Sequence, residues 1–177
     1  MTFLTDQSKH NLDLAFRKAA LATLPRNGDS CEIVPGNELS ATPVAKLLVV
    51  TISSFSFRLM VIFRLEHSPA VRGYYVGEAA GTLDEVFAEV ANLCCGMLSG
   101  ELSHTFPHVG MSIPYQLNGS CFGYLSELNP QYLANFNIRI NDSVQLHATL
   151  CMCCSDPVEV NFNAVEDETQ RGDLELF

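Results

Sequence analysis

The sequence predicts an α+β domain with two layers, in which two long helices pack on one mostly antiparallel sheet. The first observation is a pair of amphipathic helical patterns, at residues 8–24 and 82–99. The second is that each helix is followed by short runs rich in Val, Ile and Phe, which favour strands. The third is length, because 177 residues with 47 % hydrophobic side chains can bury the core of one compact domain without disulfides.

The first helix is expected to end at Leu24, because Pro25 and then Asn27-Gly28 cannot continue it. A polar loop and three strands are expected after it, at residues 26–42, 45–53, 55–65 and 73–76.

The second helix has the clearest start signal in the sequence. Thr82 followed by Glu85 forms a capping-box pattern, in which a hydroxyl and a carboxylate satisfy the first free amides. An apolar stripe follows at helical spacing, made of Leu83, Val86, Phe87, Val90, Cys94, Met97 and Leu98. The helix is expected to stop at Gly100 or in the segment just after it.

Strands are predicted again in the second half, at residues 109–114, 121–125, 135–140, 143–153 and 158–162. Asn141-Asp142 indicates a tight hairpin turn between the third and the fourth of them. Many acidic residues follow Ala164, so residues 1–164 are expected to form the domain and residues 165–177 an acidic tail.

The order of elements suggests two related α-β-β units, a pseudo-duplicated fold. The two helices share a pattern at a constant offset of 71, which pairs Leu12, Asp13, Phe16 and Ala20 with Leu83, Asp84, Phe87 and Ala91.

The composition excludes several roles. A formal net charge of −10 repels phosphate backbones and anionic lipids, so nucleic acid is not expected as a partner. Lys46 and Arg58 interrupt the most apolar stretch, residues 44–63, which argues against membrane insertion. The N-terminus has no signal-peptide pattern, and seven cysteines with two adjacent pairs do not suggest a disulfide framework. A cytoplasmic protein with reduced thiols is therefore expected.

A polar stripe runs along the second helix at steps of three and four residues, and consists of Glu85, Glu89, Asn92, Gly96 and Ser99. Asn is a mediocre helix former, and Gly inside a helix costs about 1 kcal/mol relative to Ala. A partner that approaches closely would explain both residues. An ordinary solvated helix face with a tolerated Gly is the alternative, and spacing alone favours that alternative.

The segment EVFAEVANLCCGMLSGELSHTFPHVGMSIPYQLNG resembles the motif region of the CheC/CheX/FliY phosphatases of bacterial chemotaxis. That family carries Glu-x-x-Asn on a helix and a proline where the next strand ends. Glu89 and Asn92 match the pair and Pro114 matches the proline, with Glu85 where the family often has Asp or Ser. The resemblance covers residues 83–119 and implies a CheC-like fold. Because the first helix has Lys18 and Leu21 at the corresponding positions, it implies a single-site, CheX-like protein.

The function that this resemblance implies is hydrolysis of the aspartyl phosphate on a CheY-like response-regulator receiver domain. Asn92 would orient the attacking water, and Glu89 would pair with the receiver's lysine. Glu85, Gly96 and Pro114 would contact the partner. No cofactor or metal ligand is required of this chain, since the receiver supplies Mg²⁺. The family also suggests a homodimer, and the alternative function is a non-catalytic homodimeric adaptor that binds a receiver or another signalling protein.

Other candidate ligands are open to two interpretations. His147 shares a strand with Cys151, Cys153 and Cys154, which suggests either a metal or redox site or simply packed thiols, and packed thiols are favoured because a second Cys/His pair is missing. His104 and His108 are expected in a loop, because Pro107 separates them from a helical geometry.

Overall fold

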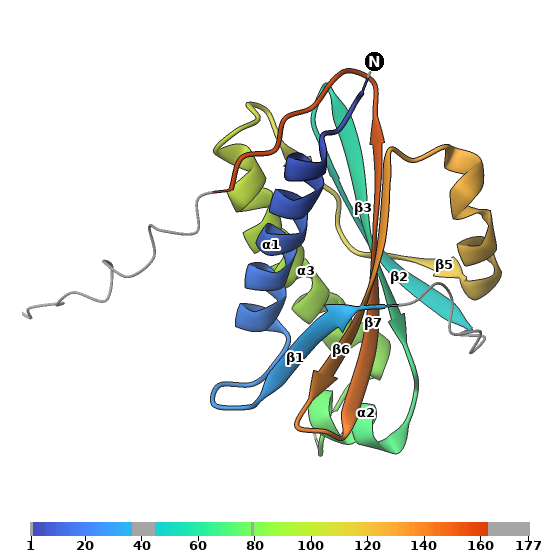
Figure 1. Cartoon of the computed structure of the whole chain (residues 1–177). Helices are drawn as coiled ribbons and strands as arrows, with labels where there is room; N and C mark the ends of the chain where they lie inside the picture. Colours follow the sequence, from blue (N-terminus) through green and yellow to red (C-terminus); the bar gives the residue numbers. More distant parts are fainter. Residues whose placement is uncertain (1, 37–44, 79, 163–177) are drawn as a thin grey trace, which may run out of the picture.

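The computed structural model describes residues 2–36, 45–78 and 80–162. Two long helices, α1 (Asp6–Thr23) and α3 (Leu83–Ser103), lie side by side on one face of a sheet, as Figure 1 shows. The predicted α+β architecture is confirmed. The remaining elements are β1 (Cys31–Pro35), β2 (Lys46–Ser53), β3 (Phe57–Leu65), α2 (Pro69–Tyr75), β4 (Gly110–Met111), β5 (Tyr115–Asn118), the 3₁₀ segment η1 (Gly119–Leu128), β6 (Tyr132–Ile140) and β7 (Val144–Cys154).

The described strands form one antiparallel sheet in the order β1-β6-β7-β3-β2-β4, and β5 also pairs with β2. The central pair takes one strand from each half of the chain, β7 and β3. Each edge strand pairs with the hairpin of the other half, β1 with β6 and β4 with β2. Exchanging the two halves therefore leaves the strand order unchanged, as a duplication requires, and each half has an edge strand in addition to the predicted α-β-β unit.

The offset of 71 residues that relates the two helix patterns in the sequence does not relate the first residues of α1 and α3. At an offset of 71, Leu83 at the start of α3 corresponds to Leu12, which lies in the second turn of α1. The matched apolar residues are buried on both helices because both have apolar faces with the same period. The duplication therefore rests on the sheet order, and the assignment of Lys18 and Leu21 as the counterparts of Glu89 and Asn92 has no support from the helix boundaries.

The main core lies between the helices and the sheet. Phe16 of α1, Phe87 of α3 and Phe63 of β3 are fully buried there. A smaller cluster on the opposite face of the sheet contains Leu47 and Cys151 and packs against Phe122 of η1. The tight hairpin predicted between the last two strands is confirmed, since both Asn141 and Asp142 have positive φ, at 48° and 57°.

Three strand predictions are wrong. Residues 73–76 belong to the end of helix α2, which starts with Ser68 as its N-cap and Pro69 in the first turn. Residues 121–125 lie in η1, whose N-cap is Asn118. Residues 158–162 make only a bridge between Val158 and Leu4, within the described part of the chain. In the last case the alternating apolar residues are buried beneath the N-terminus without joining the sheet.

Strand β1 lies inside the segment predicted as a loop. Only Ile33 of its five residues is buried, because the strand is at the edge of the sheet, so its apolar pattern is weak. The predicted acidic tail, residues 165–177, lies outside the described residues. No helix in the described part of the chain is long and apolar enough to cross a membrane.

Candidate functional site

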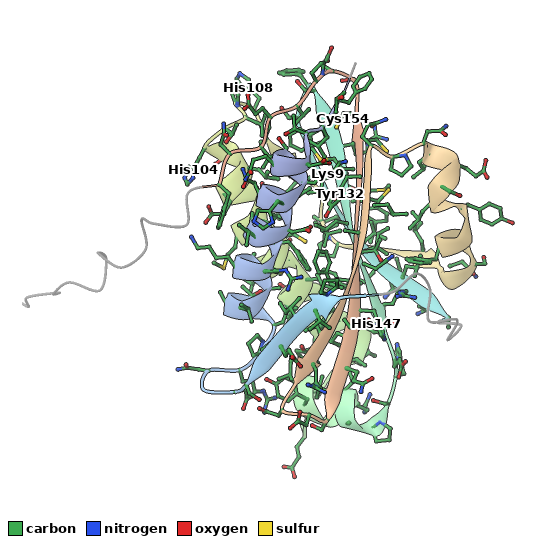
Figure 2. The ribbon with its side chains drawn as sticks, in the orientation of Figure 1. Lys9, His104, His108, Tyr132, His147 and Cys154 are labelled. Carbon is green, nitrogen blue, oxygen red and sulfur yellow. The ribbon has the colours of Figure 1, made fainter. Side chains whose placement is uncertain are left out.

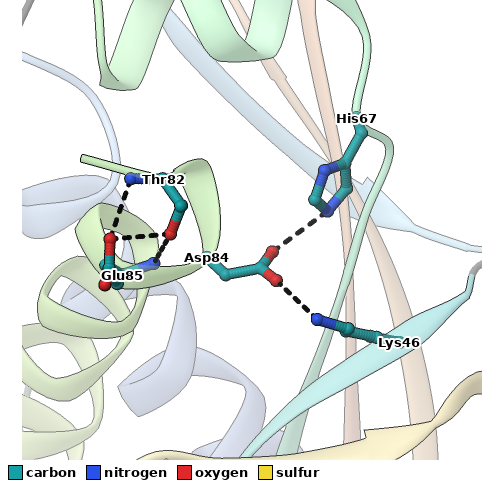
Figure 3. Close-up of polar contacts among 5 residues, drawn as sticks. All are labelled: Lys46, His67, Thr82, Asp84 and Glu85. Atoms are coloured by element: carbon teal, nitrogen blue, oxygen red, sulfur yellow. Dashed lines mark hydrogen bonds and ion pairs between the residues drawn. The ribbon is translucent and has the colours of Figure 1, made fainter. Parts of the chain in front are cut away.

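The start of α3 is fixed by the predicted capping box, drawn in Figure 3. Thr82 Oγ1 accepts a hydrogen bond from the Glu85 amide at 3.2 Å. In return, Glu85 Oε2 accepts from the Thr82 amide at 2.9 Å and from its hydroxyl at 2.8 Å. These hydrogen bonds favour the ionised carboxyl and lower the pKa of Glu85. Glu85 therefore has a structural role in the helix, and one of its oxygens is already occupied.

A second set of contacts ties the same helix end to the sheet. The Asp84 carboxylate lies 3.1 Å from Lys46 Nζ at the start of β2 and 3.0 Å from His67 Nε2 beyond β3, as Figure 3 shows. The Asp84 side chain is only 19 % exposed, whereas Lys46 and His67 are more than half exposed, so solvent reaches these pairs from the side of the two cations. The sequence pattern points to Asp84 only as a member of the repeat, although a place in the first turn of a helix favours a carboxylate.

We expect removal of the Glu85 carboxylate to destabilise the protein in a pH-dependent way. The folded-state pKa of Glu85 lies below the ordinary value of 4.5, so its contribution is fully present above that value and is lost as pH falls through the lowered pKa. Glu85→Ala should therefore lower Tm at pH 7, and the difference from the parent protein should shrink in acid. Thermal melts from pH 7 to pH 3, with Glu127→Ala as control, check this. A difference that does not depend on pH would contradict the role of the charge.

The polar stripe lies on the side of α3 that faces away from the core. Phe87 and Ala91 are buried against the sheet, whereas Glu89 is exposed and Asn92 is half-buried one turn further on. Neither the Glu89 nor the Asn92 side chain has a hydrogen bond or ion pair with another described residue. The pair is thus available to a partner, although the surrounding residues do not orient it.

Gly96 leaves the surface open beside this pair. A Cβ atom built on Gly96 meets no atom of the described residues within 4 Å, and the same is true of Gly100 one turn further along α3. Packing among these residues therefore does not require glycine at either position. The absence of side chains there gives another molecule close access to the α3 backbone next to Asn92.

Pro114 lies at the sheet edge beside α3, between β4 and β5. Met111 is opposite Ile52 and Tyr115 is opposite Val49, so four steps along this edge match three steps along β2. The extra residue forms a bulge around Pro114, which suits an edge position because proline cannot donate to the sheet. Helix α3 contacts both β2 and β4, and Asp84 lines a small pocket with Gln116 of β5. The edge that carries Pro114 therefore follows α3 from its first turn onward.

The cysteines and histidines do not gather into a site. Cys94 and Cys95 are buried in the core, where desolvation raises the pKa of both thiols, that of Cys94 to about 11. Cys151 is buried on the other face of the sheet, where burial raises the pKa of its thiol to about 12. Such thiols stay protonated and make poor nucleophiles or metal ligands.

The histidines lie on different elements. His147 on β7 bonds Asn137 at 2.8 Å, while His104 and His108 lie at and beyond the end of α3, as Figure 2 shows. In the described part of the chain, no group of three or more His, Cys, Asp or Glu residues is placed to hold a metal ion.

Comparison of the fold with solved structures connects this geometry to known proteins. A CheX in complex with CheY, BeF₃ and Mg²⁺ from Borrelia burgdorferi is similar, with a TM-score of 0.58, 13 % identity, and coverage of 82 % of this chain and 97 % of that chain. A CheC-like superfamily protein from Shewanella sp. PV-4 has a TM-score of 0.54 at 10 % identity, covering 81 % of this chain and 97 % of that one. The chain has the CheC-like fold.

The CheC-like fold is also found in a FliM middle domain from Vibrio alginolyticus, with a TM-score of 0.52, 8 % identity, and coverage of 81 % of this chain and 92 % of that chain. No protein-family model and no curated protein matches the sequence. At these identities the comparison establishes the fold. This is the fold implied by the sequence resemblance over residues 83–119. It leaves the roles of Glu89 and Asn92 as predictions.

Proposed function

We propose that this protein is a CheX-like phosphatase that hydrolyses the aspartyl phosphate of a response-regulator receiver domain. The observation that carries the proposal is the Glu89–Asn92 pair, one turn apart on the outer face of α3, with no hydrogen bond or ion pair to another described residue. The CheC-like fold supports it, since one protein of this fold has been seen in complex with CheY. The open surface at Gly96 supports it as well, because the helix must approach an aspartate closely.

Asn92 is assigned the positioning of the attacking water. An acyl phosphate is already activated, so its hydrolysis needs mainly a water held in line with phosphorus. A carboxamide oxygen accepts a hydrogen bond from that water, and the amide brings no negative charge toward the phosphoryl group. Asn92 is partly buried on a regular helix, which already restricts its side-chain rotamers. Less conformational entropy is therefore lost when the side chain is ordered by the partner.

Glu89 is assigned the pairing with the receiver's active-site lysine. Its exposed carboxylate has no cation partner among the described residues, so it is available for a charge-assisted hydrogen bond across an interface. The Mg²⁺ ion that neutralises the phosphoryl oxygens belongs to the receiver. The chain contributes the helix that carries the water-orienting amide and the anchoring carboxylate.

Glu89→Ala is expected to lower kcat/KM for receiver dephosphorylation by roughly 10- to 100-fold, because a charge-paired contact at the centre of the interface is lost. The measurement is phosphate release from a CheY-like receiver phosphorylated with acetyl phosphate in the presence of Mg²⁺. Glu127→Ala, which removes a carboxylate from exposed η1, is the matched control and should leave the rate unchanged. Equal rates for the two variants would contradict the role of Glu89.

The alternative is an adaptor that binds a receiver without turnover. The same assay separates the two functions, because an adaptor binds the phosphorylated receiver saturably and leaves the rate of phosphate loss at its intrinsic value.

A homodimer and a cytoplasmic location complete the proposal. All seven cysteines are unpaired, as the reducing cytoplasm would require, and sedimentation analysis tests the dimer.

A further inference from the structure

Two large apolar side chains are exposed on α3 next to the polar stripe. Leu93 is 62 % exposed and Met97 is 39 % exposed, and they are one turn apart. They lie on the side of α3 that faces α1, because Glu101, one turn beyond Met97, pairs with Lys18 of α1 at 2.8 Å. This side of α3 is therefore apolar and accessible at the level of Glu89 and Gly96.

A third exposed apolar side chain lies at the sheet edge that α3 contacts. Ile113 is 81 % exposed and immediately precedes Pro114, in the bulge at the sheet edge. This edge runs beside α3, which contacts β4 directly before the bulge. Leu93 and Met97 on α3 and Ile113 on the adjoining sheet edge are here called the apolar rim.

Single exposed apolar residues are common on protein surfaces, but a group of them around a polar pair is typical of an interaction site. Protein interfaces often place a few well-packed anchor side chains around the groups that decide specificity. The bulge at Ile113–Pro114 shifts the register of the sheet edge by one residue and so interrupts its regular pairing with β2 at Ile113.

We propose that the apolar rim is the surface that docks the receiver domain and supplies most of its affinity, while Glu89 and Asn92 contribute orientation and chemistry. This rests on the proposed function. The partner surface is one that presents apolar side chains around a lysine, which complements the Glu89 carboxylate at the centre of the rim. Leu93 and Met97 contact the partner from α3, and Ile113 contacts it from the sheet edge.

A second copy of this chain is a poorer occupant of the same surface. A two-fold contact places identical patches against each other, so Glu85 and Glu89 of both copies would lie in one interface without a basic group between them. Like charges in one interface are unfavourable. A basic group at the centre of the partner removes this penalty.

The test is the affinity of the receiver for variants of the rim. Leu93→Ser and Ile113→Ser are each expected to weaken binding of the phosphorylated CheY-like receiver about tenfold or more, measured by calorimetry, with a matching rise in KM and little change in kcat. Tyr124→Ser is the matched control, because Tyr124 is 69 % exposed but lies on η1, which packs on the opposite face of the sheet. Thermal melts confirm that the variants remain folded.

The outcomes separate the two proposals. If the parent protein binds and dephosphorylates the receiver while both rim variants bind like Tyr124→Ser, the rim is not the docking surface and the proposed function stands. If the parent protein binds without turnover, the rim is still tested by the binding constants. If the parent protein does not bind any phosphorylated receiver, both proposals fail. Conversion of a dimer to a monomer by Leu93→Ser would instead assign the rim to a second copy of the chain.

Discussion

Asn92→Ala is expected to reduce the rate of receiver dephosphorylation by about 100-fold or more, to a value close to the intrinsic decay of the phosphorylated receiver. The reason is that misplacing the attacking group by about 1 Å can cost about 100-fold in rate, and without the carboxamide nothing on α3 orients the water. The rate should be measured in single-turnover experiments with excess enzyme, so that binding does not limit it.

Asn92→Ala should lower neither the affinity for the receiver nor the stability of the protein. The Asn92 side chain has no hydrogen bond to another described residue, and alanine is a better helix former than asparagine, so Tm should stay constant or rise slightly. The binding constant should change little, because Glu89 and the apolar rim remain. Asn161→Ala, which changes an exposed asparagine near the end of the described chain, serves as the matched control.

An Asn92→Asp variant sharpens the test. It keeps the size of the side chain and its ability to accept a hydrogen bond, but it places a negative charge next to the phosphoryl group and removes the amide donor. We expect it to be as inactive as Asn92→Ala. Activity near the parent level in either variant would contradict the assignment of Asn92 and would favour the adaptor function.

The helix that carries the site could be predicted from the sequence because its signals are local. The Thr82–Glu85 capping box, the apolar stripe and the three-residue spacing of Glu89 and Asn92 all lie within a few turns, and the structure has the capping box as expected. The hairpin at Asn141-Asp142 was predictable for the same reason. Residues 73–76 were misassigned because their aromatic and β-branched side chains outweighed the start signal at Ser68 and Pro69.

The apolar rim and the anchor at Asp84 could not be predicted, because they depend on pairing between distant segments. Ile113 lies in the bulge between β4 and β5, and the pairing of both strands with β2 determines that register. Asp84 meets Lys46 and His67, which come from β2 and from the segment after β3. The position of β1 beside β6 is likewise decided by the duplicated sheet and not by its own five residues.

Phe87→Ala is expected to lower the free energy of unfolding by about 3–5 kcal/mol, the usual cost of emptying a fully buried phenylalanine site. Phe87 is 0 % exposed, and its ring lies edge-on to Phe63 of β3 at 5.5 Å and to Tyr75 of α2 at 5.0 Å between ring centroids. One side chain thus joins the site helix to the sheet and to α2. For a chain of this length, Tm should fall by roughly 10 °C.

The matched control for this loss is Leu93→Ala on the same helix, which removes an exposed side chain and should change stability by about 0.5 kcal/mol or less. When receiver binding is measured, Leu93→Ala should weaken it, because Leu93 belongs to the apolar rim. Phe87→Ala should leave binding unchanged, because Phe87 faces the core on the other side of α3. At a temperature where Phe87→Ala remains folded, its kcat should be close to that of the parent protein. A large loss of kcat in the folded variant would show that the Phe63–Phe87–Tyr75 contacts set the orientation of α3, and hence of Asn92, as well as its stability.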